Sequence, residues 1–352
     1  MNDYKSNIES LMLSYYVKYK RLLPMINTAF SGNPSKEVDV YIDLYDMLKP
    51  VYTREVYANK KFIIVSSIMN LVAHYRRYFA TRHSVNTNIF LIYGGSTSPS
   101  HKTFVKDFGD DQFRETLNYQ STHKFIMDQL KLVKILTGYI SHVYYIERTV
   151  DFSLEATSNI RIRKDIPSVV ITKSAYAMQI PAFNPNAIVI RPKKLADGDN
   201  SYFISYNTVL ANYFHKISRG STIQKISELN PELISLIMTI TGLQSYNLKS
   251  VANSTQAINI IYDAIINNRI INGYNNDIDF VYDNLYGIEK YIDKTNFKFR
   301  YNAIDLIYQF RAYMNTPESR DITWMVNFYD PEALKEINDK YFADCPIDLE
   351  SL

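Results

Sequence analysis

The chain has 352 residues and a formal net charge of +3, a balance too weak by itself to indicate a nucleic-acid-binding protein. Its 46% hydrophobic and 21% charged residues exclude an intrinsically disordered chain. A single cysteine, Cys345, excludes an internal disulfide framework and predicts a reducing compartment. There is no apolar run of about 18 residues and no secretory signal pattern, so we expect a cytoplasmic protein without a membrane span.

The first hundred residues predict two helices and two strands. Apolar residues at helical intervals predict a helix over 4–30 and another over 60–82. The runs VDVYIDLY (38–45) and NIFLIYGG (88–95) are rich in β-branched and aromatic residues, which is typical of buried strands.

The alternation of helices and strands continues through the middle of the chain. A helix is predicted over 119–147, and strands are predicted over 167–174, 186–194 and 201–207. From residue 208 the pattern is helical almost to the end. Strands that alternate with helices favour parallel pairing. We therefore predict an α/β fold with a mainly parallel central sheet flanked by helices, and an all-helical C-terminal part.

Six short motifs follow one another in an order that points to a known family. They are VYIDLYDML (40–48), FLIYGGS (90–96), SHKTFVKDFGDDQFR (100–114), DFSLEATSNI (151–160), VVITKSAYAMQI (169–180) and TGLQSYNLKSVANSTQAINII (241–261). In this order they resemble the flap endonuclease and 5′→3′ exonuclease superfamily, whose fold is related to the PIN domain. The resemblance covers roughly residues 38–265.

The resemblance implies a division of the chain into four parts. These are an N-terminal helical extension (1–35), a nuclease-like α/β core (36–207), a helix–three-turn–helix region (208–270) and a C-terminal helical extension (271–352). No linker-like tract separates the parts, so we expect one compact body.

The family's metal site is the point at which this sequence departs from the pattern. Clustered carboxylates hold two divalent cations around the scissile phosphate in such enzymes. The resemblance places Asp43 and Glu155 at two of the acidic positions. The other positions are occupied by Gly94, Thr157, Ser158, Ser174, Tyr176, Leu243 and Tyr246, with Lys173 beside them. Two carboxylates near an ammonium do not neutralise two Mg²⁺ ions. We therefore predict no catalytic residues and no cofactor, with Asp43 and Glu155 as remnants that hold at most one weak ion.

A rearranged site is the alternative that would restore an active, Mg²⁺-dependent 5′→3′ exonuclease or flap endonuclease. Asp46, Asp110, Asp111, Glu147 and Asp151 are the acids that could rebuild it. Glu147, Asp151 and Glu155 would share one face of a continuous helix. Such spacing is more typical of a solvated helix face.

Predicted nucleic-acid contacts come from basic and small polar residues of the motifs and from the basic run RIRK (161–164). They are Lys102, Lys106, Arg114, Arg161, Arg163, Lys164, Asn247, Lys249, Ser250 and Asn253. Lys and Arg neutralise phosphates, and basic runs interleaved with Tyr, such as YYVKYKR (15–21), could also stack on bases. The run RPKK (191–194) is a further basic cluster. Ser250 and Asn253 stand where the family prefers glycine, so their side chains narrow the approach of a phosphate to the backbone.

These observations lead to one functional prediction and two alternatives. We predict a catalytically inactive 5′-nuclease-like protein that binds DNA or other proteins in a viral or phage replication, transcription or virion complex. A viral source rests on the abundance of Tyr, Ile and Asn, which AT-rich genomes produce, and would place the protein in the host cytoplasm or virion. The alternatives are the rearranged active nuclease and a purely structural or adaptor protein that touches no nucleic acid.

Overall fold

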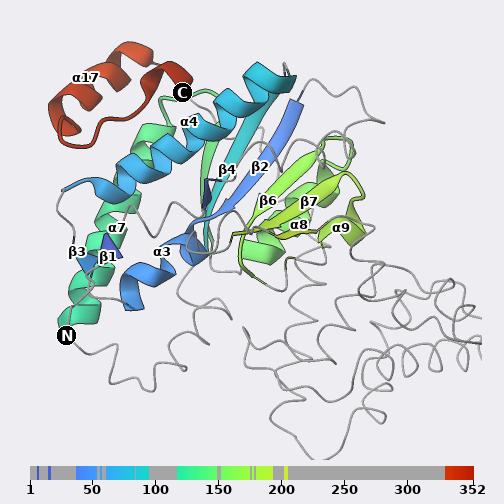
Figure 1. The fold of residues 1–352 in the computed structure, drawn as a ribbon, viewed down its shortest axis with the longest axis horizontal. Helices are drawn as coiled ribbons and strands as arrows, with labels where there is room; N and C mark the ends of the chain where they lie inside the picture. The colour runs from blue at the N-terminus through green and yellow to red at the C-terminus, as the bar shows by residue number, and fades with distance from the viewer. Residues whose placement is uncertain are drawn as a thin grey trace, which may run out of the picture.

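The computed structural model describes an α/β core together with the C-terminal residues of the chain (Figure 1). The described residues are 6–7, 15–16, 37–53, 56–57, 61–83, 85–94, 117–148, 152–174, 177, 180–192, 202–204 and 330–352. The predicted helix–three-turn–helix region and the loop over residues 100–114 lie outside them.

A six-stranded sheet forms the centre of the described structure, in the strand order β5-β4-β2-β6-β7-β8. The strands are β2 (Glu37–Asp43), β4 (Asn86–Gly94), β5 (Val143–Arg148), β6 (Ser168–Ile171), β7 (Ala187–Arg191) and β8 (Tyr202–Ile204). All neighbouring strands run parallel except β7 and β8, which are antiparallel. This arrangement confirms the predicted mainly parallel sheet.

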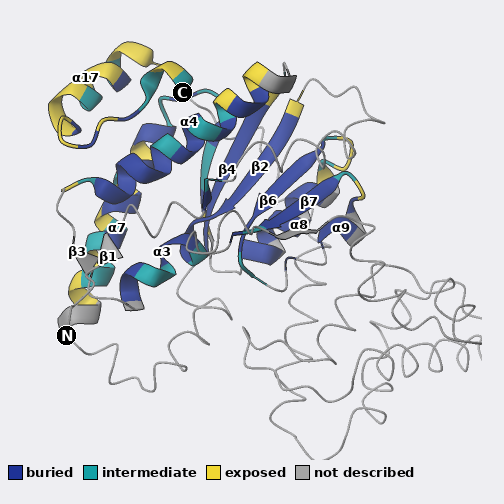
Figure 2. Cartoon of the chain, viewed as in Figure 1, coloured by how far each residue is buried: buried dark blue, intermediate teal, exposed yellow. Residues whose placement is uncertain are grey.

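The central strand β2 is covered on both faces, as Figure 2 shows by its burial colours. Val38, Val40 and Ile42 belong to the main hydrophobic core. Since successive side chains of a strand point to opposite faces, Asp39, Tyr41 and Asp43 share the other face. The helices around the sheet are α3 (Leu44–Thr53), α4 (Ile63–His83), α7 (Leu117–Thr137), α8 (Phe152–Ile162) and α9 (Ile180–Phe183). The predicted α/β sandwich of sheet and helices is thus present.

The helix predicted over 119–147 is wrong beyond Thr137. There α7 ends, and the N–H of Gly138 bonds back to the carbonyl of Ile135 at 3.1 Å. Val143–Arg148 then forms strand β5, which pairs with β4. The β-branched and aromatic run after the turn was the signal for a strand. Glu147 therefore lies in a strand, and the helix face that it was predicted to share with Glu155 does not exist.

Two further differences concern the beginning of the chain. Ser6–Asn7 (β1) pairs with Val56–Tyr57 (β3) as a short parallel ladder, so the helix predicted over 4–30 is wrong at those residues. Helix α3 begins directly after β2, in a stretch that was assigned to the opening strand. Within the described residues, no helix is long and apolar enough to cross a membrane.

The last residues of the chain form a C-terminal clasp, defined here as residues 330–352, that packs on α4 (Figure 1). Its helix α17 (Pro331–Tyr341) is capped by Asp330, whose Oδ1 accepts the Ala333 N–H at 2.9 Å. Asn70 of α4 donates to the Pro346 carbonyl at 3.2 Å, and Arg77 pairs with Asp348. The buried side chains of the clasp are Leu334, Phe342, Cys345 and Ile347. The helical prediction for this end is confirmed for α17, and Cys345, expected in a polar tail, is instead buried.

Candidate functional site

The carboxyl ends of the central parallel strands meet at one edge of the sheet, which we call the carboxylate edge. Asp43 ends β2, and Thr172 directly follows the neighbouring strand β6. The Thr172 hydroxyl donates to Asp43 Oδ2 at 2.7 Å, and both side chains are buried. The sheet register therefore brings together two residues that are 129 positions apart in the sequence.

Asp43 also serves as the N-cap of α3. Its Oδ1 accepts the N–H of Asp46 at 3.0 Å, and Asp46 is the third residue of that helix. A side-chain acceptor for the third helical N–H is the usual capping contact, and aspartate is among the preferred capping residues. Each oxygen of the Asp43 carboxylate thus accepts a hydrogen bond from this chain.

Asp46 receives hydrogen bonds from two other parts of the molecule. Its Oδ2 accepts the backbone N–H of Lys173 at 2.7 Å and the hydroxyl of Tyr15 at 2.9 Å. The pKa of Tyr15 is raised well above its usual value by burial, and the negative charges of Asp46 and Asp43 raise it further. Tyr15 consequently stays protonated at neutral pH and remains a donor to the carboxylate.

The start of α8 joins the same edge through hydroxyl groups. Ser153 Oγ donates to Ser174 Oγ at 3.1 Å, and the N–H of Ser174 donates to Thr172 Oγ1 at 3.0 Å. Because Thr172 also donates to Asp43, a continuous chain of hydrogen bonds runs from α8 to β2. This edge is held together by hydroxyl groups and backbone N–H groups.

Glu155, the second remnant carboxylate, lies in the first turn of α8 and is buried. Its Oε1 accepts from Asn159 Nδ2 at 3.0 Å, one turn further along the helix. An anionic side chain in the first turn of a helix is stabilised by the unpaired N–H groups there. Glu155 Oε1 is therefore held by a residue of its own helix.

The described residues of this edge bring few carboxylates together. Two Mg²⁺ ions need several carboxylate oxygens directed at them, and the described residues contain no cluster of three or more metal-ligating side chains. Where the resembled family has aspartates, Gly94 ends β4, Ser174 bonds to Ser153, and Thr157 donates to the Ser153 carbonyl at 2.5 Å. The side chains of Ser158, Tyr176, Leu243 and Tyr246 lie outside the described residues.

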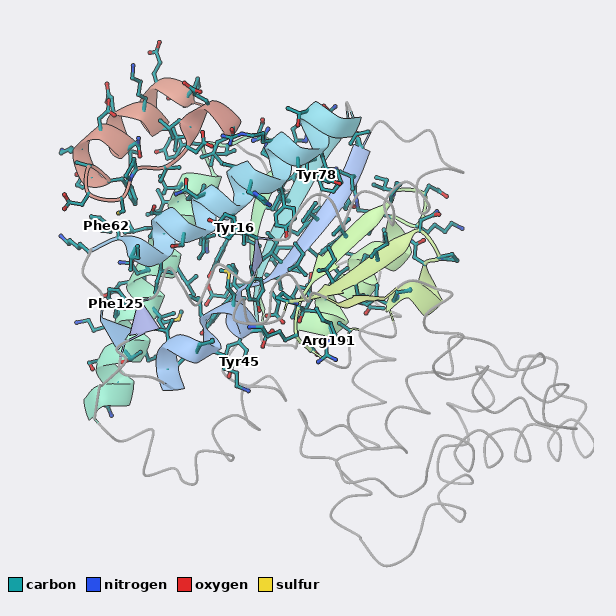
Figure 3. All side chains as sticks on the ribbon, in the orientation of Figure 1. Tyr16, Tyr45, Phe62, Tyr78, Phe125 and Arg191 are labelled. Atoms are coloured by element: carbon teal, nitrogen blue, oxygen red, sulfur yellow. The ribbon has the colours of Figure 1, made fainter. Side chains whose placement is uncertain are left out.

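Two basic side chains lie at the carboxylate edge. Lys173 follows β6, and Arg191 ends β7 at the same end of the sheet as Tyr45 (Figure 3). Arg191 Nη2 donates to the Lys173 carbonyl at 2.8 Å. Arg191 was absent from the predicted binding residues, although it opens the basic run RPKK. Thr172 was missed entirely, and no local pattern marks it.

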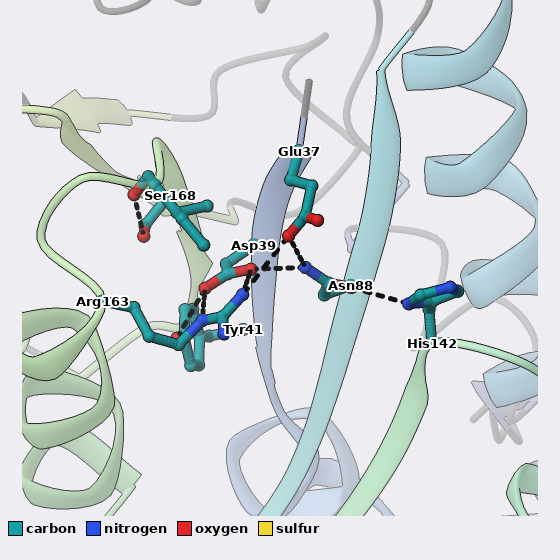
Figure 4. Close-up of polar contacts among 8 residues, drawn as sticks. Glu37, Asp39, Tyr41, Asn88, His142, Arg163 and Ser168 are labelled. Atoms are coloured by element: carbon teal, nitrogen blue, oxygen red, sulfur yellow. Dashed lines mark hydrogen bonds and ion pairs between the residues drawn. The ribbon is translucent and has the colours of Figure 1, made fainter. Parts of the chain in front are cut away.

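A second polar cluster lies at the amino end of β2 (Figure 4). Asp39 is fully buried there, and Arg163 donates to it through Nε at 2.6 Å and Nη2 at 3.0 Å. Asn88 Nδ2 and the Tyr41 hydroxyl also donate to Asp39, at 2.9 and 3.2 Å. Burial raises the pKa of Asp39, and these four hydrogen bonds oppose that rise. Asn88 extends the cluster to His142, whose Nδ1 lies 3.0 Å from Asn88 Oδ1.

The structure places the predicted nucleic-acid-binding residues unevenly. Arg163 and the exposed Lys164 lie at the amino end of β2, opposite Asp43, and the Arg163 guanidinium is engaged by Asp39. Arg161 belongs to α8, and its side chain lies outside the described residues. Lys102, Lys106, Arg114, Asn247, Lys249, Ser250 and Asn253 also lie outside them. The binding roles of all these residues stay predictions.

Comparison with solved structures finds similar chains at low sequence identity. A zinc-bound T5 5′-exonuclease matches with a TM-score of 0.43 and 14% identity, over 88% of this chain and 98% of that one. The catalytic core of Rad2 in complex with a DNA substrate matches with a TM-score of 0.43 and 11% identity, over 90% and 93%. No protein-family model and no curated protein sequence matches the chain.

The capping role of Asp43 predicts different outcomes for two substitutions. We expect Asp43→Ala to lower the free energy of unfolding by about 1–2 kcal/mol, because the Asp46 N–H and the Thr172 hydroxyl lose their acceptor. Asp43→Asn should cost less, since asparagine caps helices about as well as aspartate. Chemical denaturation in EDTA measures both. An Asn variant as unstable as the Ala variant would contradict the capping role.

The buried ion pair at the amino end of β2 predicts a large stability effect. Arg163→Met should destabilise the fold by about 3 kcal/mol, because it leaves the Asp39 carboxylate buried without its cation. The double variant Arg163→Met/Asp39→Asn should be more stable than Arg163→Met, because the asparagine side chain at position 39 carries no buried charge. Lys164→Met is the matched control on the neighbouring, exposed residue, and we expect it to change stability by less than about 0.5 kcal/mol.

The hydrogen-bonded carboxylate edge predicts that metal ions do not stabilise the protein. An ion present at 100 times its dissociation constant would add about 2.7 kcal/mol to stability, a rise of several degrees in melting temperature. We expect melting temperatures in EDTA, Mg²⁺ and Mn²⁺ at matched ionic strength to agree within about 1 °C. A reproducible rise with Mn²⁺ over the sodium chloride control would contradict this expectation.

Proposed function

We propose that this chain is a catalytically inactive 5′-nuclease-like protein that binds nucleic acid at its carboxylate edge. The observation that carries the proposal is the use of both Asp43 oxygens as acceptors, for the Thr172 hydroxyl and the Asp46 N–H. Each carboxylate oxygen has two lone pairs, and these donors use one on each oxygen. The remaining lone pairs of a single carboxylate do not neutralise two Mg²⁺ ions, which need several such groups.

The cations of the edge support binding without cleavage. Lys173 Nζ lies 4.9 Å from the centre of the Tyr15 ring, whose hydroxyl donates to Asp46, and Arg191 Nη2 donates to the Lys173 carbonyl. Such charges attract phosphate groups. An ammonium group, unlike a divalent metal ion, does not lower the pKa of a coordinated water to generate a nucleophile. The described residues of the edge therefore support an anion-binding role.

The biological setting that we propose is a viral or phage complex for replication, transcription or virion assembly, with DNA or other proteins as partners and no metal cofactor. The amino-acid usage of an AT-rich genome supports the viral source. The rearranged nuclease loses the shared helix face of Glu147 and Glu155, because Glu147 lies in β5 and Glu155 in α8. Glu147 instead lies near the carboxyl end of β5, at the same edge of the sheet as Asp43.

Binding of a fluorescently labelled DNA oligonucleotide at increasing salt tests the proposal. We expect the logarithm of the association constant to fall linearly with the logarithm of the salt concentration. Lys173→Met should make this slope shallower by about one, the change expected for one lost phosphate contact. Lys131→Met, an exposed lysine of α7 paired with Asp128, should leave the slope unchanged. An affinity that does not depend on salt would instead favour the adaptor alternative.

A cleavage assay with flap and 5′-ended DNA substrates, run in Mg²⁺ and in Mn²⁺, completes this test. We expect substrate to remain intact at enzyme concentrations that saturate binding. Cleavage that EDTA abolishes, and that Asp43→Asn also abolishes, would establish the active-nuclease alternative and refute the proposal.

A further inference from the structure

Tyr15 reaches the carboxylate edge from the N-terminal part of the chain. Its side chain is fully buried, and its hydroxyl donates to Asp46 Oδ2 at 2.9 Å across 31 sequence positions. Asp46 lies one helical turn after Asp43, so Tyr15 stands at the edge where we place nucleic-acid binding.

Helix α4 holds the backbone and the neighbour of Tyr15 in place. The Tyr75 hydroxyl donates to the Tyr15 carbonyl at 2.7 Å, and the Tyr16 hydroxyl donates to the Ser67 carbonyl at 3.0 Å. The Tyr16 ring also meets the His74 ring edge-on, at 5.2 Å between centroids. Tyr15 is thus positioned by contacts on α4 that do not involve the carboxylate edge itself.

The ring of Tyr15 lies against the cation that the proposed function uses. Lys173 Nζ is 4.9 Å from the ring centroid, which is within the range of a cation–π contact. The backbone N–H of Lys173 and the Tyr15 hydroxyl share one acceptor, Asp46 Oδ2. Tyr15, Lys173 and Asp46 therefore form one three-residue contact, and a phosphate that binds Lys173 must compete with the ring.

We propose that the buried ring of Tyr15 covers Lys173 and thereby limits how tightly the carboxylate edge binds nucleic acid. This inference rests on the proposed function, because it assigns the regulation of the same edge. Tyr15 belongs to the main hydrophobic core, and at the edge it makes one hydrogen bond to a carboxylate and one ring–ammonium contact. The ring is therefore a fixed part of the edge, and a phosphate that approaches Lys173 meets it there.

Two measurements on the full chain test the inference, with Tyr15→Ala as the main variant and Tyr16→Ala as its matched control. The first is the rate at which an amine-reactive reagent labels Lys173, read by peptide mass spectrometry. We expect Tyr15→Ala to raise that rate about fivefold, as loss of a cation–π contact of ordinary strength predicts. Tyr16→Ala removes the neighbouring ring and should leave the Lys173 rate unchanged. Tyr15→Phe, which keeps the ring and is the milder change, should stay close to the parent chain.

The second measurement is oligonucleotide binding at low salt, on the same variants. Tyr15→Ala should bind a few times more tightly than the parent chain and Tyr16→Ala should not. Unchanged labelling of Lys173 in Tyr15→Ala would overturn the inference whatever the binding data. Faster labelling with unchanged affinity would overturn the regulatory role of Tyr15 and leave the proposed function standing. Absence of salt-dependent binding in the parent chain and in every variant would refute the proposed function itself, and with it the regulation that we assign to Tyr15.

Discussion

The carboxylate of Asp43 links β2, α3 and β6. One oxygen caps the helix that follows it, and the other accepts from Thr172 at the end of the adjacent strand. Because Asp43 is buried, these donors offset the cost of burying its carboxylate. The geometry of the carboxylate edge therefore depends on this one group.

The face of the sheet that carries Asp43 is divided into three zones along β2. The Asp39 cluster occupies the amino end, and Asp43 occupies the carboxyl end. Between them, Tyr41, Phe90 and Tyr144 stack across three neighbouring strands, with ring centroids 4.7 and 5.1 Å apart. Helix α8 joins both polar zones, through Ser153 at its start and through Arg163, which follows its end. The aromatic row thus separates the buried ion pair from the edge where ligands are proposed to bind.

The sequence predicts the layers of this fold better than its contacts. β-Branched runs between helical segments were enough to indicate the parallel sheet. Strand β5 was missed because only a short turn separates it from α7, so its apolar residues continued the helical pattern. Helix α3 was missed because Asp43, the residue before it, was interpreted as a metal ligand at the end of a strand and not as a helix cap. Thr172 bonds to Asp43 across 129 positions, and Lys173 bonds to Asp46 across 127 positions. Both contacts become visible only once β2 and β6 are paired.

Ser174 and Thr157 stand where the resembled family has aspartates, and both contact Ser153. Removing carboxylates from a metal cluster relieves their mutual repulsion once the cations are gone. Two of the residues at these positions also form hydrogen bonds. Ser174 accepts from Ser153, and Thr157 donates to the Ser153 carbonyl. An aspartate at position 157 would remove the donor to the Ser153 carbonyl, and an aspartate at position 157 or 174 would place a new charge near the start of α8, which already holds Glu155. Ser174 and Thr157 thus share Ser153 as a partner, and a change at either position is felt at the start of α8.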